Sequence, residues 1–345
     1  MKIINFISGK DMGGPKQSFI LYSEILISFD YEVTSLIRQG ALLKHAMKDM
    51  GILTKEVDYI RSTHPVFKGK AVNHLKNTIS PINAPIILVH KQIDIELVRN
   101  ALGDDIKIIG IIHGLNFKHT EYADTLIAVS DKVKQFLIDS GCTKPIYTIP
   151  NMVKISTEPN YKDLPGVPLI GAMGIFRRKK GFHVLIQALA LLKQNDVPFK
   201  AIIAGKGRIT WYLKYLRWKL DLTNELTMRG WVANNERDEF IDNIDLYVLP
   251  SRTETFGMVV VEAMARMKRV VATRCGGPEE IITNNIDGFL VEKQNPEKLA
   301  EKIQYLIENP QVSKKIPNSA NKTASEKYSL NAVSKFLKPI IERNA

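Results

Sequence analysis

Short apolar runs alternate with segments of helical spacing along almost the whole chain of 345 residues. Most of the runs are rich in isoleucine and valine and are uniformly apolar, which is typical of parallel strands covered on both faces. We therefore expect an α/β fold built from βαβ units with right-handed crossovers. The candidate strands lie at residues 2–8, 31–37, 54–60, 85–90, 106–113, 125–130, 146–150, 168–174, 199–205, 226–230, 245–250, 269–273 and 288–292.

A chain of this length is more than one hydrophobic core usually supports, and two sheets fit the strands better than one. The best boundary is the polar, proline-containing stretch that begins at Asn151 and shows no periodicity. We predict two Rossmann-like domains whose parallel sheets face each other across a cleft. The expected divisions are residues 1–150, a linker at 151–165, a second domain at 166–325 and a C-terminal helical segment at 326–345.

The formal charge of +12 and the pI of about 9.4 favour anionic partners. Nucleic acid, acidic lipid headgroups and phosphorylated small molecules all remain open on this ground. The charge is partly clustered, because residues 61–81 contain no aspartate or glutamate and residues 177–180 read RRKK.

Two cysteines, Cys142 and Cys275, stand far apart and in no metal-like spacing. This usage argues against a disulfide framework and favours a reducing cytoplasm. The first apolar run is too short for a secretion signal, and no run approaches the ~20 apolar residues that span a bilayer. We therefore expect a cytoplasmic protein, and any contact that it makes with a membrane must be peripheral.

Ligands of open α/β sheets bind beyond the carboxyl ends of the strands, so the loops that follow strands carry the candidate site. Gly13 and Gly14, after the first strand, could let a helix start approach an anion, and a plain turn is equally compatible. His113 ends the fifth strand and is either a packed structural residue or a catalytic one. Gly205 ends a strand of the second domain and marks a ligand edge or a tight turn.

A glycine-bearing strand end at Gly171 and Gly174 leads into the basic run Arg177–Lys180 and then into a helix expected near Gly181. Cations beside a helix N-terminus can neutralise a diphosphate. A solvated basic turn is the alternative, and the position after a strand end favours phosphate binding.

Two carboxylates stand eight positions apart in the stretch PSRTETFGMVVVEAMARM. Glu254 lies in the loop after a strand, and Glu262 lies inside an apolar run of the helix expected to begin near Phe256 and Gly257. A carboxylate in such a run is costly to bury unless something binds it. Sugar hydroxyls, a paired-carboxylate hydrolase site and a metal are the alternatives. No cluster of aspartate or histidine supports the metal.

Residues 209–222 place Trp211, Tyr215 and Trp218 on one helical face, with basic residues interleaved. Such a face is compatible with a membrane surface or with nucleic acid. We prefer the interpretation that these aromatic rings pack on their own domain.

Taken together, these segments resemble a retaining glycosyltransferase of the GT-B fold, in glycosyltransferase family four (glycosyl transferases group 1). The residues from Leu249 to Val291 are similar to the E-x(7)-E signature of that family and the block after it. The residues from Ile111 to Val153 resemble its His-strand-Ser-helix-Asn segment. The resemblance covers nearly the whole chain.

The resemblance implies roles for these residues in metal-independent, retaining hexosyl transfer. Glu262 binds the ribose of a nucleotide-diphosphate sugar, and Glu254 holds the donor sugar. Lys180 stabilises the departing diphosphate, and His113 reaches the sugar from the first domain. The other expected donor contacts are the glycines Gly13, Gly14, Gly174 and Gly205, the cations Arg177 and Arg178, and the backbone of Phe256, Gly257 and Met258.

One departure from the family is Ile175, which stands where an arginine usually follows the glycine matching Gly174. We expect Arg177 or Arg178 to substitute for it. A catalytically silent sugar-nucleotide-binding protein of the same fold is the main alternative. A nicotinamide-dependent dehydrogenase lacks its glycine fingerprint here, and no nucleic-acid-binding motif appears.

The resemblance also implies an acceptor bound mainly by the first domain, where the acid-free residues 61–81 lie. We expect that segment to face an anionic or lipid-linked acceptor at the cytoplasmic face of the inner membrane. The implied process is synthesis of a cell-surface polysaccharide or lipopolysaccharide of bacterial type. The donor is a substrate, and no cofactor is expected.

Overall fold

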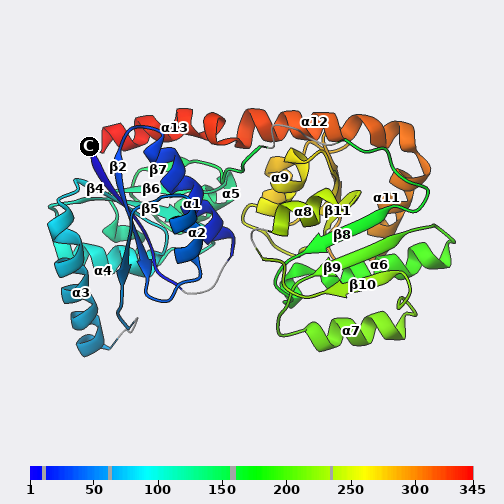
Figure 1. Cartoon of the computed structure of the whole chain (residues 1–345), viewed down its shortest axis with the longest axis horizontal. Coiled ribbons are helices and arrows are strands. Elements are labelled where there is room, and N and C mark those ends of the chain that lie inside the picture. The colour runs from blue at the N-terminus through cyan, green and yellow to red at the C-terminus, as the bar shows by residue number, and fades with distance from the viewer. Residues whose placement is uncertain (10–12, 61–63, 156–160, 234–235, 345) are drawn as a thin grey trace. The chain divides into compact units, whose positions relative to one another are not determined.

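The computed structural model describes residues 1–9, 13–60, 64–155, 161–233 and 236–344. The chain divides into two compact units, each an α/β structure with its own sheet. Unit 1 comprises Met1–Met152 and Leu330–Ala345, and unit 2 comprises Val153–Ser329. Figure 1 shows the elements of each unit along the chain.

Unit 1 is built on a parallel sheet of seven described strands in the order β3-β2-β1-β4-β5-β6-β7. The order reverses between β1 and β4, so this is the switch point at which open α/β sheets bind ligands. The strands are β1 (Lys2–Ile7), β2 (Glu32–Arg38), β3 (Thr54–Val57), β4 (Ile86–Val89), β5 (Lys107–Ile112), β6 (Thr125–Ala128) and β7 (Ile146–Thr148).

The helices of unit 1 include the last helix of the chain, which returns to the first sheet. That helix, α13, packs on α1, and Thr125 Oγ1 donates to Asn344 Oδ1 just beyond it, at 2.9 Å. The helical segments are α1 (Gly14–Ile27), α2 (Leu43–Asp49), α3 (Pro65–Ile79), η1 (Ser80–Ile82), α4 (Gln92–Leu102), η2 (Thr120–Tyr122), α5 (Asp131–Asp139) and α13 (Leu330–Arg343).

Unit 2 is built on a parallel sheet of six described strands in the order β10-β9-β8-β11-β12-β13. Its order reverses between β8 and β11. The strands are β8 (Leu169–Met173), β9 (Lys200–Ala204), β10 (Leu226–Arg229), β11 (Leu246–Leu249), β12 (Arg269–Thr273) and β13 (Phe289–Val291).

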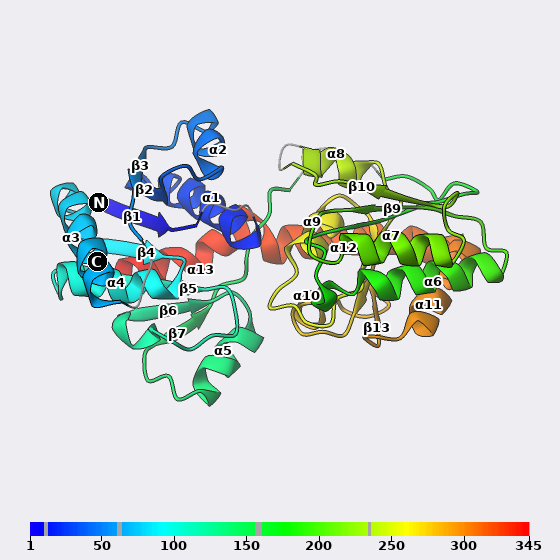
Figure 2. The ribbon, with the colours of Figure 1, turned by 90° about the horizontal axis from the view of Figure 1, so that it is seen from below.

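The helices of unit 2 cover a core in which Leu189, Ile203 and Val248 are fully buried. Figure 2 shows α6, α7 and α11 on one side of this sheet, where α6 contacts both α7 and α11. The helical segments are η3 (Arg178–Lys180), α6 (Phe182–Gln194), α7 (Thr210–Lys219), α8 (Arg237–Asp242), α9 (Met258–Ala265), α10 (Gly277–Ile281), α11 (Pro296–Glu308) and α12 (Pro310–Tyr328).

The predicted fold class is confirmed, because each of the thirteen candidate strands is present and pairs in parallel. The central strands are uniformly apolar because they are buried on both faces, as in β4, where every residue is inaccessible to solvent. The edge strands β3, β7 and β10 are partly exposed. The contact division falls after Met152 and after Ser329, where Val153 and Ser329 form an isolated bridge. Within the described residues, no helix combines the length and apolarity that crossing a bilayer requires.

Candidate active site

The carboxyl edge of the sheet in unit 2 gathers most of the predicted site residues. Gly174 follows β8 and Gly205 follows β9, and the Gly174 N–H donates to Ala204 O at 3.0 Å. The loop after β11 carries Glu254, and α9 begins directly beyond it. Parallel strands bring all these loops to one edge.

Lys180 and Glu254 form an ion pair at this edge. The Lys180 Nζ lies 2.6 Å from Glu254 Oε1, and Ser251 Oγ donates to the same oxygen at 2.6 Å. The two charged side chains are 27% and 12% exposed. The backbone of Glu254 is fixed on both sides, since its N–H donates to Cys275 O and its carbonyl accepts from Gly277 N. The carboxylate is therefore held in place, with its lysine beside it.

Gly181 allows the basic loop to approach this carboxylate. It is the N-cap of α6 with φ of +67°, and a Cβ built on it would lie 1.7 Å from Pro250 O. No other residue fits such a contact without movement of the backbone. The Arg252 N–H also donates to Lys179 O at 2.8 Å. The loops after β8 and β11 are thus joined through their backbones.

Glu262 is half-buried in the second turn of α9 and has a charged partner. Its neighbours Val261 and Ala263 are inaccessible, and its own side chain is 12% exposed. Glu262 Oε2 accepts a hydrogen bond from Arg237 Nη2 of α8. The cost expected for a carboxylate in an apolar run is therefore offset by an arginine that sequence reasoning missed. No local spacing signal connects Arg237 with Glu262, because they lie on different helices.

The start of α9 can offer backbone groups to a ligand. Gly257 is the N-cap with φ of +117°, and the side chains of Phe256 and Met258 are buried. The N–H groups of a first helical turn have no partner within the helix itself. Met258 can therefore contribute through its backbone N–H. Phe256 precedes the N-cap, so its backbone contact with a donor stays a prediction, and both side chains belong to the core.

The predicted cations of the loop after β8 are exposed. Arg177 and Arg178 are both accessible, and Ile175 is half-buried. Burial and the charges of Arg178 and Arg252 lower the pKa of His183, which places both arginines near that ring. Arg252 is a cation of this edge that the sequence analysis did not include.

In unit 1, His113 belongs to a line of polar side chains across the switch point. The His113 Nε2 lies 3.0 Å from His90 Nδ1 after β4, and His90 Nε2 lies 2.9 Å from Asn5 Oδ1 in β1. The two imidazole rings stack with centroids 5.2 Å apart. His90 and Asn5 are buried and were missed in the sequence, where each simply ends or interrupts an apolar strand.

Both imidazoles are neutral near pH 7. Burial, and to a smaller extent the charge of Lys91, lowers the pKa of His113 to about 3. Burial also lowers the pKa of His90 well below its usual range, together with the nearby His113 and Lys16. His113 can therefore act as a neutral hydrogen-bonding group.

Gly13 and Gly14 lie at the start of α1, with Gly13 as its N-cap in an extended conformation. A Cβ on Gly13 would have no neighbour within 4 Å. Residues 10–12, in the same predicted loop, lie outside the described residues. The approach of a diphosphate to these glycines stays a prediction.

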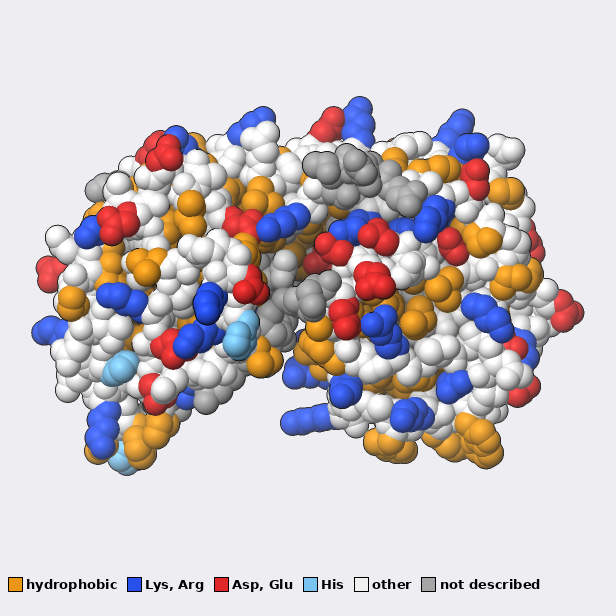
Figure 3. All heavy atoms as spheres, viewed as in Figure 1, with side chains coloured by type: hydrophobic (Ala, Val, Ile, Leu, Met, Phe, Trp, Pro, Cys, Tyr) orange, Lys and Arg blue, Asp and Glu red, His pale blue; other side chains and the backbone are white. Residues whose placement is uncertain are grey.

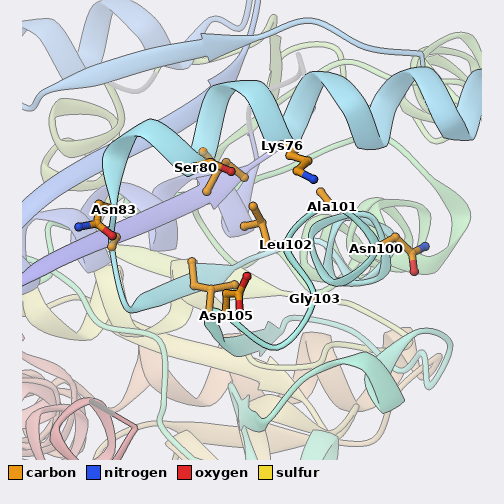
Figure 4. A pocket seen from close by; sticks show the side chains of 11 residues that line it. Lys76, Ser80, Asn83, Asn100, Ala101, Leu102, Gly103 and Asp105 are labelled. Carbon is orange, nitrogen blue, oxygen red and sulfur yellow. The ribbon is translucent and has the colours of Figure 1, made fainter.

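Two hollows in unit 1 differ in their position on the sheet. One of about 500 Å³ is lined by Lys76, Ser80, Asn83, Asn100 and Asp105, and Figure 4 shows them around its opening. It precedes β4 and β5, and so lies at the edge away from His113.

The other hollow, of about 320 Å³, is lined by Tyr59, Phe67, Lys70 and His74, among others, and follows β3. It therefore lies at the carboxyl edge, the same edge as His113. In the described residues, His, Cys, Asp and Glu side chains form no group of three or more that could hold a metal ion.

Comparison with known proteins identifies the family. The family model described as glycosyl transferases group 1 matches residues 158–323. An uncharacterized glycosyltransferase of Methanocaldococcus jannaschii is 31% identical over 279 residues, which cover 81% of this chain and 73% of that protein. The chain belongs to the glycosyl transferases group 1 family.

Two further relatives of this group 1 glycosyltransferase match over nearly its full length. The lipopolysaccharide core biosynthesis glycosyltransferase LpsE of Rhizobium meliloti is 22% identical over 339 residues, covering 96% of each chain. The crystal structure of Anabaena HepE in complex with UDP and glucose superposes with a TM-score of 0.84 at 21% identity, covering 99% of each chain. The shared architecture confirms the predicted GT-B fold.

Proposed function

We propose that this glycosyltransferase moves a hexosyl group from a nucleotide-diphosphate sugar to a glycan or lipid-linked acceptor, with retention and without a metal. The observation that carries the proposal is the Lys180–Glu254 pair at the carboxyl edge of unit 2. A lysine ammonium has three N–H donors, so one can serve Glu254 while others reach a diphosphate.

The proposed role of Lys180 follows from the charge that develops in transfer. Cleavage of the bond between the sugar and the phosphate builds negative charge on the diphosphate and positive charge on the anomeric carbon. A cation positioned beforehand stabilises the first without reorganisation at the moment of reaction. Arg177, Arg178 and Arg252 supply further positive charge near this loop.

Glu254 and Glu262 are proposed to bind hydroxyl groups of the donor. In each carboxylate, one oxygen is engaged by a cation: Oε1 of Glu254 by Lys180, and Oε2 of Glu262 by Arg237. A carboxylate has about four acceptor sites over its two oxygens. Glu254 can therefore accept from the sugar and Glu262 from the ribose while both keep a fixed orientation.

His113 is proposed to contact the reacting sugar. Its neutral imidazole can hydrogen-bond a hydroxyl without adding positive charge beside the anomeric carbon, which becomes positive in the transition state. The low pKa of His113 and its stacking on His90 support this role.

The acceptor is proposed to be anionic or lipid-linked and to bind unit 1 at the cytoplasmic face of the inner membrane. Residues 64–81 of the acid-free segment contain the whole of α3 and the start of η1, and residues 61–63 lie outside the described part. Phe67, Lys70 and His74 line the hollow after β3, which combines apolar and cationic groups. The relationship to LpsE supports a place in cell-surface polysaccharide or lipopolysaccharide synthesis.

A thermal-unfolding screen of UDP-, GDP- and ADP-sugars tests donor binding. A donor at 100 times its Kd adds about 2.7 kcal/mol to the free energy of unfolding. We expect one nucleotide class to respond and the Glu262→Ala variant to lose that response, while Glu326→Ala, an exposed change on α12, keeps it. An unchanged response in Glu262→Ala would overturn the ribose role.

A catalytically silent sugar-nucleotide-binding protein is the second candidate, favoured by Ile175 at the place of the usual arginine. The transferase and the silent binding protein are separated by measuring nucleoside diphosphate release from the nucleotide sugar that stabilises the chain in the thermal screen. Release that depends on an added acceptor supports transfer, and binding without release in the presence of glycan and lipid-linked acceptors supports the silent alternative.

A further inference from the structure

The outer face of α7 carries an exposed row of aromatic and basic side chains. Trp211 is 71% exposed, Trp218 is 69% exposed and Tyr215 is 47% exposed. Lys214 and Lys219 are exposed between and beside them. At 100° per residue, the five side chains occupy an arc of roughly 140° on one side of the helix. The preferred sequence interpretation, that these rings pack on their own domain, is wrong.

The inner face of α7 explains this orientation. Leu213 and Leu216 are buried in the core of unit 2, where α7 contacts α6. Figures 1 and 2 show α7 on the outer side of the unit. In Figure 3, hydrophobic side chains gather at the lower margin of unit 2, where α7 lies, with lysine and arginine side chains beside them. The outer row is therefore displayed by an anchored helix.

The chemistry of the row matches the interface of an anionic bilayer. Tryptophan and tyrosine have an apolar ring and a polar group, and such side chains favour the boundary between headgroups and acyl chains. Lysines on the same face attract acidic headgroups, and the whole chain carries a net charge of +12. Two largely exposed tryptophans on one helix face are unusual for a surface that contacts only water. Exposed apolar patches of this kind usually mark a binding surface.

We propose that the outer face of α7 binds the surface of an anionic membrane, with its aromatic rings at the headgroup boundary. This extends the peripheral contact proposed above to a surface in unit 2, and it rests on that proposal only for its biological setting. Trp211 stands in the first turn of α7, on the side of the carboxyl edge of β9, where Gly205 lies. The α7 row shares no residue with the Lys180–Glu254 pair, so adsorption and donor binding can be tested with separate variants.

Sedimentation of the full chain with vesicles tests the proposal. Vesicles of phosphatidylcholine alone are compared with vesicles that also contain phosphatidylglycerol, and we expect binding to the second. Because a lysine near an anionic surface contributes about fivefold in affinity, Lys214→Glu with Lys219→Glu should weaken binding by about 25-fold or more. Trp211→Ala with Trp218→Ala should weaken it by about tenfold or more.

The matched control is Lys293→Glu with Lys322→Glu, which makes the same change of charge at exposed positions elsewhere on unit 2. We expect this control to lose much less affinity than the α7 lysine variant. Equal loss in the two variants would show attraction by net charge alone and would overturn the assignment to α7.

Tryptophan fluorescence gives a second readout. The chain contains three tryptophans, so Trp231→Phe leaves only the two on α7. Their emission should shift to the blue with anionic vesicles and be quenched by brominated acyl chains. The absence of both the shift and the quenching would overturn the proposal. It would also be overturned if the chain bound DNA or an acidic protein but did not bind the anionic vesicles. The α7 variants should keep the stabilisation by a nucleotide sugar in the thermal-unfolding screen. If the wild-type chain showed no such stabilisation, that result would count against the proposed function and not against membrane binding by α7.

Discussion

Lys180 and Glu254, 74 positions apart in the chain, meet through a contact of 2.6 Å between Nζ and Oε1. The contact joins the loop after β8 to the loop after β11, and two backbone contacts support it. Gly181 lies against Pro250, and Arg252 donates to Lys179. The ammonium proposed to bind the diphosphate and the carboxylate proposed to bind the sugar are thus fixed relative to each other by the fold.

Removal of the Lys180 charge should slow transfer far more than it weakens the fold. Loss of one preorganised group that stabilises developing negative charge typically lowers kcat by about 10²–10³-fold. We expect Lys180→Met to show a loss of this size in nucleoside diphosphate release. Lys179→Met, at the adjacent exposed lysine, is the control and should stay within a few-fold of wild type. Equal loss in both variants would assign the effect to the basic loop as a whole.

Arg237 should be energetically coupled to Glu262. Removal of one partner leaves a mostly buried charged group without compensation, which costs about 1–3 kcal/mol. We expect Arg237→Met and Glu262→Gln each to lower the free energy of unfolding in urea by this order. The double variant should lose less than the sum, with a coupling of about 1 kcal/mol or more. Additive losses would show that the ion pair contributes nothing beyond its separate members.

The sheets could be predicted because each strand is encoded locally by its own apolar run. The positions of Lys180, Glu254 and Glu262 could be predicted for the same reason, since they stand near recognisable strand ends and helix starts. Arg237, His90 and Asn5 could not, because their roles depend on side chains that meet only after folding. Burial explains why the partner of Glu262 is charged, but it does not say which arginine fills that place.

The exposed row of α7 was misjudged for a different physical reason. Apolar and aromatic residues of this helix span roughly 220° of its circumference, from Trp218 round to Leu213, so hydrophobic periodicity does not select the inner face. The smaller leucines Leu213 and Leu216 fill the core, and Trp211 and Trp218 remain outside. The sequence identified the aromatic face correctly and placed it on the wrong side.

The stability of unit 1 should depend on pH through His113. Its pKa is about 3 in the folded protein, below the usual value of about 6.5 in an unfolded chain. Between pH 3 and pH 6.5 the unfolded chain binds more protons than the folded chain. The free energy of unfolding therefore falls as the pH is lowered below about 6.5, and the contribution of His113 is fully present above that pH. From pH 7 to pH 5, His113 alone should account for about 2 kcal/mol.

Urea unfolding of wild type and His113→Gln at a series of pH values measures this contribution. The difference between the two proteins should change by about 2 kcal/mol from pH 7 to pH 5, with wild type losing more. Subtraction removes the titration of groups that both proteins share. A difference that stays constant with pH would mean that His113 titrates alike in the folded and unfolded chains.

Gly181 should be required both for the stability of unit 2 and for the placement of Lys180. Alanine at φ of +67° is strained, and its Cβ would overlap Pro250 O, so Gly181→Ala should lower the free energy of unfolding by about 3 kcal/mol. Gly166→Ala is the control, because its Cβ would meet nothing within 4 Å and its φ is not positive. Relief of the overlap must separate the loop after β8 from Pro250, and therefore Lys180 from Glu254. The surviving folded fraction of Gly181→Ala should consequently transfer at least about tenfold more slowly, since small displacements of a catalytic group are costly. Wild-type turnover by that fraction would show that the glycine serves folding alone.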